Sequence, residues 1–211
     1  MAHLRKASPD QWTKVPDWQP VHDAAIDGAG KGKFLAGSHS NHAGTRAYKL
    51  YVPGGCREQA LPLIVMLHGC QQNPDDFAAG TDMNRVAEES NCFVLYPAQL
   101  QAANMSHCWN WFKANDQQRD QGEPSIIADL TREISRTYPI DTRRIYVAGL
   151  SAGGAMAAIM GAAYPDLYAA VGIHSGLPVG AAHDLLSAFA AMKNGMAGTG
   201  PLAAQANGAA T

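Results

Sequence analysis

One serine of this chain stands in a pattern that is typical of a catalytic nucleophile. A short buried strand is predicted to run into Gly149-Leu-Ser151-Ala-Gly153, and the small residues at 155–163 predict a helix behind it. A serine placed there sits on a sharp strand-to-helix turn, where side chains at the two glycine positions would collide. The helix N-terminus offers free N–H groups and a positive dipole end to a developing oxyanion. A serine that only caps a helix does not need small residues on every side, so Ser151 is interpreted as the nucleophile.

A second segment is predicted to complete an oxyanion-binding arrangement. His68, Gly69, Cys70 and Gln71 follow a predicted central strand, in the loop that supplies the other backbone N–H to such a site. The N–H of Cys70 or of Gln71 would hold the oxyanion together with the N–H of Ala152, and the sequence does not decide between the first two. Losing one such donor typically lowers the rate about a hundredfold or more. His68 is interpreted as a brace of the loop rather than as the catalytic base.

A serine hydrolase also needs a histidine base and an acid that orients it. Their expected order along the chain is nucleophile, acid, histidine, and only Asp166, Asp184, His174 and His183 follow the nucleophile. His183 precedes Asp184 by one residue, so these two cannot form that pair in order. We interpret the four side chains as turn-capping or surface groups and predict no triad from them.

Two tryptophans and four cysteines leave alternatives open. Trp109 and Trp111 stand in a long irregular loop at 101–121, at the sheet edge where ligands bind in open α/β folds. They could bind substrate by lining an apolar cleft, and the alternative is packing at the base of the loop. A disulfide between Cys70 and Cys108 is one possibility, but without an export signal we expect buried, reduced thiols. The full set is Cys56, Cys70, Cys92 and Cys108, and its spacing does not indicate a zinc site.

Strands and helices that position these residues alternate along the chain. Two antiparallel strands with a polar turn between them are expected at 34–38 and 46–52. Strands and helices then alternate, which predicts an α/β fold with a mostly parallel sheet and helices on both faces. The further strands are expected at 61–67, 92–96 and 169–173, and further helices at 82–90, 125–138 and 184–192.

Composition and charge bound the class of protein. The chain has 211 residues, enough for one domain with a substantial core. Its 16 Lys and Arg against 18 Asp and Glu give no electrostatic case for nucleic acid or an anionic membrane as a partner, and no apolar run approaches the roughly 20 residues of a membrane span. No metal or cofactor is expected. A polar lead-in is predicted at 1–33, the α/β domain at 34–192 and a low-complexity flexible tail at 193–211.

Several motifs together resemble the polyhydroxybutyrate depolymerase-type esterases, a family of α/β-hydrolases. In chain order they are LPLIVMLHGCQQNPDDFAAGTDMNRVAEE, CWNWF, GEPSIIADL and RIYVAGLSAGGAMAAIMGAAYPDLYAAVGIHSG. The resemblance implies an ester hydrolase that cleaves polyhydroxyalkanoate or hydroxybutyrate-type esters through an acyl-enzyme on Ser151. Relatives include feruloyl and acetylxylan esterases, so those esters are the alternative substrates.

The chain also departs from the pattern of that family. The resemblance places the acid in a later His-Gly-Asp-type strand end and the base in a later Gly-His segment, and neither occurs here. We therefore expect a truncated chain that lacks the last strands, and a non-catalytic remnant is a further hypothesis. The strand at 169–173 would then be an apolar sheet edge open to self-association. The absence of a signal peptide predicts a cytoplasmic protein, whereas the resemblance offers secretion as the alternative.

Overall fold

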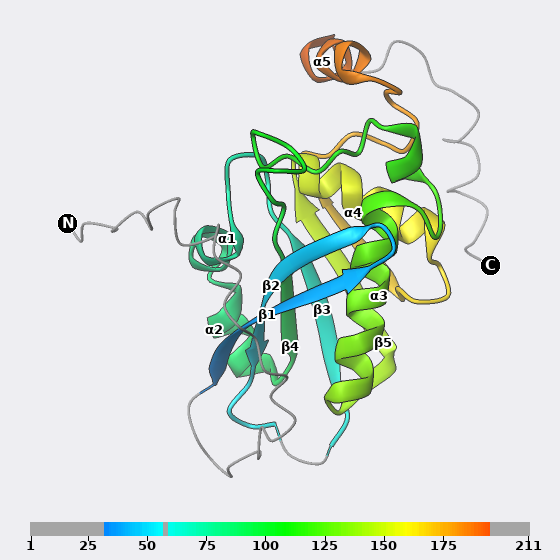
Figure 1. The fold of residues 1–211 in the computed structure, drawn as a ribbon. Coiled ribbons are helices and arrows are strands. Elements are labelled where there is room, and N and C mark those ends of the chain that lie inside the picture. Colours follow the sequence, from blue (N-terminus) through cyan, green and yellow to red (C-terminus); the bar gives the residue numbers. More distant parts are fainter. Residues whose placement is uncertain (1–31, 57–58, 195–211) are drawn as a thin grey trace, which may run out of the picture.

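The structure, a computed structural model, describes residues 32–56 and 59–194 (Figure 1). Almost all of the predicted lead-in and tail therefore lies outside the described residues. The strands are β1 (Lys33–Asn41), β2 (Gly44–Val52), β3 (Leu61–Leu67), β4 (Phe93–Pro97), β5 (Ile140–Leu150) and β6 (Ala170–His174). The helices are α1 (Pro74–Thr81), α2 (Met83–Ser90), α3 (Gly122–Thr137), α4 (Ala152–Ala163) and α5 (Leu185–Asn194), with a short 3-10 helix, η2, at Ala114–Gln117.

The six strands form one mixed sheet in the order β1-β2-β4-β3-β5-β6. The β1–β2 and β2–β4 pairs are antiparallel, and the three pairs from β4 to β6 are parallel. The predicted hairpin is confirmed, and its turn is closed by the Asn41 side chain, whose Oδ1 accepts the Ala43 N–H. Parallel strands bring their carboxyl ends to one edge, so β3 and β5 deliver the loops that follow them to the same place.

Helices cover both faces of the sheet, as predicted. Successive side chains of a strand point to opposite faces, and β3 therefore contributes to two cores. Val65 packs in one cluster with Ile127 of α3 and Met156 of α4. Met66 packs in the other with Phe77 of α1. This α/β architecture holds β3 and β5 rigidly between two layers of helices (Figure 1).

Two helices differ from the prediction for local reasons. Helix α1 was not expected, although Asn73 caps it by accepting the Asp76 N–H and Pro74 occupies its first turn. Helix α3 begins at Gly122 rather than at 125, because Pro124 lies in its first turn and does not interrupt it. Proline is tolerated there since its missing N–H would have no helical partner.

Strand β6 is an edge strand with exposed apolar side chains. Of the described strands it pairs with β5 alone, and Val171 and Ile173 are 39% and 53% exposed. No strand follows β6 within the part of the chain that the structure describes. The predicted apolar edge is therefore present, while self-association through it stays a prediction that size-exclusion chromatography can test.

Candidate active site

Ser151 occupies a strained turn between β5 and α4. Its backbone has φ 56° and ψ −118°, a conformation that costs a non-glycine residue of the order of 1–3 kcal/mol. The turn is held on both sides, because the Ser151 N–H donates to the His174 carbonyl at 2.8 Å and the Ser151 carbonyl accepts the Ala155 N–H at 2.9 Å. The side chain itself is exposed. This is the geometry that presents a nucleophile at the carboxyl edge of a sheet.

The glycines on either side of Ser151 are required by backbone contacts. A Cβ atom at Gly153 would lie 2.5 Å from the His68 carbonyl oxygen and closer still to that of Leu67. A Cβ atom at Gly149 would lie 2.8 Å from the Gly154 nitrogen and closer still to the Gly153 carbonyl. Real Cβ atoms essentially never approach within 3.0 Å. The predicted collision is confirmed, and the same contacts seat α4 directly on the end of β3.

Among the described residues, the backbone N–H groups around Cys70 in the loop after β3 have partners, whereas that of Cys70 has none. The Gly69 N–H donates to Gln72 Oε1 at 2.8 Å, the Gln71 N–H to the Ser106 carbonyl at 2.7 Å and the Gln72 N–H to the Gly69 carbonyl at 3.4 Å. The Cys70 N–H makes no hydrogen bond with any described residue. Of the two candidates that the sequence left open, only Cys70 thus keeps a backbone donor for a substrate.

His68 fixes the peptide that carries this donor. Its Nε2 accepts the Gln99 N–H at 3.0 Å, so the ring proton is on Nδ1, which donates to the Gly69 carbonyl at 2.8 Å. Burial lowers the pKa of His68 to about 4 and keeps the ring neutral. Both ring nitrogens are engaged, so His68 braces the loop and is not free to act as a base. In a trans peptide the C=O and N–H point in opposite directions, so holding the Gly69 carbonyl also aims the Cys70 N–H.

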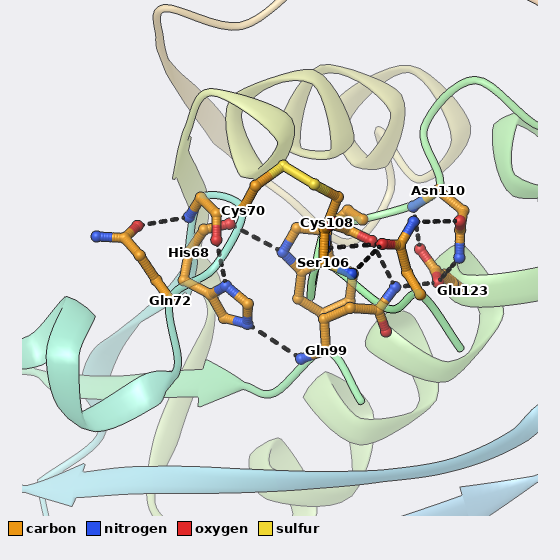
Figure 2. Close-up of a disulfide and its surroundings, with 11 residues drawn as sticks. His68, Cys70, Gln72, Gln99, Ser106, Cys108, Asn110 and Glu123 are labelled. Carbon is orange, nitrogen blue, oxygen red and sulfur yellow. Dashed lines mark hydrogen bonds between the residues drawn. A yellow bond between two sulfur atoms is a disulfide. The ribbon is translucent and has the colours of Figure 1, made fainter. Parts of the chain in front are cut away.

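A disulfide joins Cys70 to Cys108 and ties this loop to the one after β4 (Figure 2). The expectation of reduced thiols is therefore wrong for this pair, because the two loops meet at the sheet edge and bring the sulfurs together. It holds for Cys56 and Cys92, which are buried and do not form a disulfide.

The two tryptophans belong to the core. Trp109 has no exposed surface, and its indole N–H donates to the His68 carbonyl at 3.1 Å. Trp111 is 5% exposed and packs edge-to-face on Phe112. The expectation that they line an open substrate cleft is therefore wrong in this structure, because the base of the loop needs both indoles to fill it. Packing, the alternative interpretation, applies.

A buried carboxylate that the sequence did not single out organises the same loop. Glu123, in the first turn of α3, is 4% exposed and accepts a hydrogen bond from Arg46. It also accepts hydrogen bonds from Gln99 and Asn110 (Figure 2). Its own N–H donates to Asp116 Oδ1 at 2.7 Å. Burial raises the pKa of Asp116 to about 6, and the neighbouring Glu123 charge adds to the shift.

Asp166, Asp184 and His174, which follow the nucleophile, contact other groups. Asp166 forms a two-point ion pair with Arg119 at 2.5 and 2.9 Å, and these hydrogen bonds lower the pKa of Asp166 to about 2. Asp184 caps the start of α5, and the His174 ring contacts a neighbouring serine hydroxyl. Between described residues, no hydrogen bond joins the Ser151 hydroxyl to a histidine. Within the described part of the chain, these groups do not form a triad with Ser151.

The described residues contain neither a metal-binding cluster nor a membrane-spanning helix. No three His, Cys, Asp or Glu side chains among them come together as a metal ion would require. None of the described helices is long and apolar enough to cross a membrane.

Known proteins similar to this chain are named as depolymerases and esterases. Poly(3-hydroxyalkanoate) depolymerase C of Paucimonas lemoignei is 36% identical, over 69% of this chain and 35% of the relative. Poly(3-hydroxybutyrate) depolymerase of Ralstonia pickettii is 30% identical, over 84% of this chain and 35% of the relative. Feruloyl esterase B of Neurospora crassa is 32% identical, over 65% and 46%. The chain thus spans about a third of the length of the two depolymerases it matches.

A solved structure and a family profile agree with these similarities. Acetyl xylan esterase from Aspergillus awamori superposes with a TM-score of 0.64 over 75% of this chain and 56% of that one, at 21% identity. That likeness shows the α/β-hydrolase fold. Residues 46–208 match the profile described as Esterase PHB depolymerase. With most of its length covered by this match and with depolymerase relatives at 30–36% identity, the chain belongs to the esterase PHB depolymerase family.

Proposed function

We propose that the chain acts as a carboxylic ester hydrolase through an acyl-enzyme on Ser151. The observation that carries this proposal is the strained and exposed Ser151 turn, which adjoins two segments whose Cys70 and Ala152 N–H groups have no partner among the described residues. A weak nucleophile such as a serine hydroxyl needs this placement together with a proton acceptor. Family membership supports the same reaction class.

The two donors are the N–H groups of Cys70 and Ala152. Ala152 is the first residue of α4, so its N–H has no helical acceptor and lies at the positive end of the helix dipole. The loop that carries Cys70 abuts the nucleophile turn, since a Cβ atom at Gly69 would lie 3.5 Å from the Leu150 carbonyl oxygen. Donors fixed in this way stabilise the negative oxygen of a tetrahedral intermediate without reorganising during the reaction.

The chemistry then proceeds in two halves. The Ser151 oxygen bonds to the ester carbonyl carbon while a base takes its proton, and the oxyanion rests on the two N–H groups. Collapse of the intermediate expels the alcohol, which takes up that proton, and leaves the acyl group on the serine. Water attacks the acyl-enzyme in the same way and releases the acid. In this fold the base is a histidine that follows the nucleophile in the chain, and the family resemblance places it in a later Gly-His segment.

For the substrate, we propose polyhydroxyalkanoate or hydroxybutyrate-type esters. The support is that two of the most similar relatives are named depolymerases of these polyesters. Feruloyl and acetylxylan esters are the second candidates, because a feruloyl esterase B and acetylxylan esterases also match the chain. Initial rates on hydroxybutyrate oligomers, methyl ferulate and acetylated xylan separate the three classes.

A fluorophosphonate probe tests the nucleophile directly. We expect the folded chain to be labelled at one site and the labelling to vanish in Ser151→Ala. Ser40→Ala is the matched control, because Ser40 is an exposed serine whose hydroxyl contacts the Thr45 hydroxyl in the β1–β2 turn. A folded wild-type chain that takes no label refutes the proposal and favours the non-catalytic remnant.

An oxidising compartment is the proposal that we favour for the site of action. The Cys70–Cys108 disulfide supports it, since disulfides persist mainly outside the reducing cytosol. Mass spectrometry of protein alkylated directly in cells and culture medium tests it, and a reduced pair in the native host contradicts it.

A further inference from the structure

The Glu123 carboxylate is the buried point at which three separate segments meet. Its Oε1 accepts from Gln99 Nε2 at 2.5 Å, from Asn110 Nδ2 at 2.7 Å and from Arg46 Nη2 at 3.3 Å. Its Oε2 accepts the Asn110 backbone N–H at 2.8 Å. The carboxylate therefore binds β2, the end of β4 and the disulfide loop at once, from its place on α3.

Gln99 connects Glu123 to the loop after β3 through hydrogen bonds (Figure 2). It is 2% exposed, and besides Glu123 its Nε2 contacts the Cys108 carbonyl at 3.0 Å. Its carbonyl oxygen accepts from His107 Nδ1 at 2.9 Å. Its backbone N–H is the one that His68 Nε2 accepts. Every backbone and side-chain polar group of Gln99 is thus engaged, and one of them fixes the His68 ring.

The path ends at the proposed oxyanion donor. His68 Nδ1 holds the Gly69 carbonyl, and the N–H on the other side of that peptide belongs to Cys70. The disulfide and the Gln71–Ser106 hydrogen bond fasten the same loop to the segment that Glu123 and Gln99 hold. A shift of Glu123 or Gln99 is therefore expected to tilt the Gly69–Cys70 peptide plane and to turn the Cys70 N–H away from the oxyanion.

We propose that Glu123 and Gln99 are positioning residues that set the orientation of the Cys70 N–H, although neither touches the substrate. This inference rests on the proposed function, because it takes the Cys70 N–H as an oxyanion donor. A carboxylate suits the position, since it only accepts hydrogen bonds and four donors converge on it. In Glu123→Gln, an NH₂ group faces at least one of these donors, and the buried Arg46 charge loses its partner.

Kinetics give one arm of the test. In Glu123→Gln, a displacement of the Cys70 N–H by a fraction of an ångström to about 1 Å is expected to lower kcat about tenfold to a hundredfold. KM should stay nearly unchanged, because the hydrogen bond from the Cys70 N–H to the oxyanion forms in the transition state. Gln99→Met is the second variant, since it keeps the length of the side chain and the backbone N–H but breaks the link to Glu123. Thr131→Val is the matched control on α3, where it removes a fully buried hydrogen bond to Tyr168 that lies outside this network.

Amide hydrogen exchange and imidazole NMR of the same variants give the second arm, which needs no activity. We expect exchange at the Gln99 and Gln71 N–H groups to accelerate at least about tenfold more than at core amides of α4, and the His68 Nδ1–H signal to weaken. The control should accelerate core amides evenly. If the wild-type protein neither takes the fluorophosphonate label nor hydrolyses esters, the proposed function fails. The hydrogen-exchange and NMR measurements still test whether Glu123 and Gln99 position the Cys70 N–H. Uniform exchange and an unchanged His68 signal in Gln99→Met overturn the proposal, even if Glu123→Gln does not fold.

Discussion

A single methyl group at Gly153 should separate the nucleophile turn from the oxyanion loop. In Gly153→Ala the new Cβ atom meets the His68 carbonyl oxygen at 2.5 Å and the Leu67 carbonyl oxygen even closer. Reaching the 3.0 Å limit takes about 0.5 Å of retreat at the His68 oxygen and more than that at the Leu67 oxygen, so α4 has to retreat by more than about 0.5 Å. Both obstacles are backbone atoms of the buried β3 end and cannot rotate away. Overpacking of this kind costs about 1–3 kcal/mol, and we expect a loss of about 2–3 kcal/mol in the free energy of unfolding.

Urea unfolding measures this loss, and Gly80→Ala is its matched control. Gly80 lies in α1 with nothing within 4 Å of an added Cβ atom, so alanine there should be neutral or stabilise by up to about 1 kcal/mol. The retreat of α4 also displaces the Ala152 N–H, which should slow fluorophosphonate labelling about a hundredfold in Gly153→Ala. A Gly153→Ala variant within about 0.5 kcal/mol of wild type that labels at the normal rate would refute this reasoning.

Two further predictions concern the disulfide and a buried acid. The Cys70–Cys108 bond spans 38 residues, so reducing it should lower the free energy of unfolding by about 2–4 kcal/mol. Dithiothreitol should therefore lower the urea midpoint of unfolding. The buried thiols of Cys56 and Cys92 should not react with a thiol reagent until the chain unfolds. Asp116, whose pKa burial raises to about 6, keeps its proton in the folded state between about pH 4 and 6, where the unfolded chain has lost it. The free energy of unfolding that Asp116 contributes therefore decreases as pH rises through that window. In urea titrations, the free energy of unfolding of Asp116→Asn should decrease less than that of the wild type over the same pH range. An equal decrease in both proteins would contradict the assignment.

Local backbone chemistry explains what the sequence could predict. Gly149 and Gly153 are needed because of a turn formed by adjacent residues, so the pattern alone indicated both the turn and the exposed Ser151. The apolar runs of β3 and β4 indicated buried strands for a similar reason, since burial on both faces leaves no polar positions. None of these inferences required knowledge of which distant segments meet.

The features of the site that the sequence did not reveal all depend on contacts between segments that are distant in the sequence. Nothing in the isolated segments shows that Arg46, Gln99 and Asn110 converge on Glu123, and an acid beside a proline at a helix start is typically solvated. The choice between Cys70 and Gln71 required the Ser106 carbonyl, which lies in another loop. The pairing of Cys70 with Cys108 and the burial of Trp109 follow from the same contact between loops.

The pairing of β3 with β5 also determines the order in which the site is built. Leu67 pairs with Gly149 across about 80 residues of sequence, and contacts this distant form slowly because a long loop has to close first. Every residue proposed to hold the Cys70 N–H lies before β5 in the chain. During synthesis on the ribosome, the loop that carries the Cys70 N–H can therefore be fastened before Ser151 and the second donor, the Ala152 N–H, have emerged.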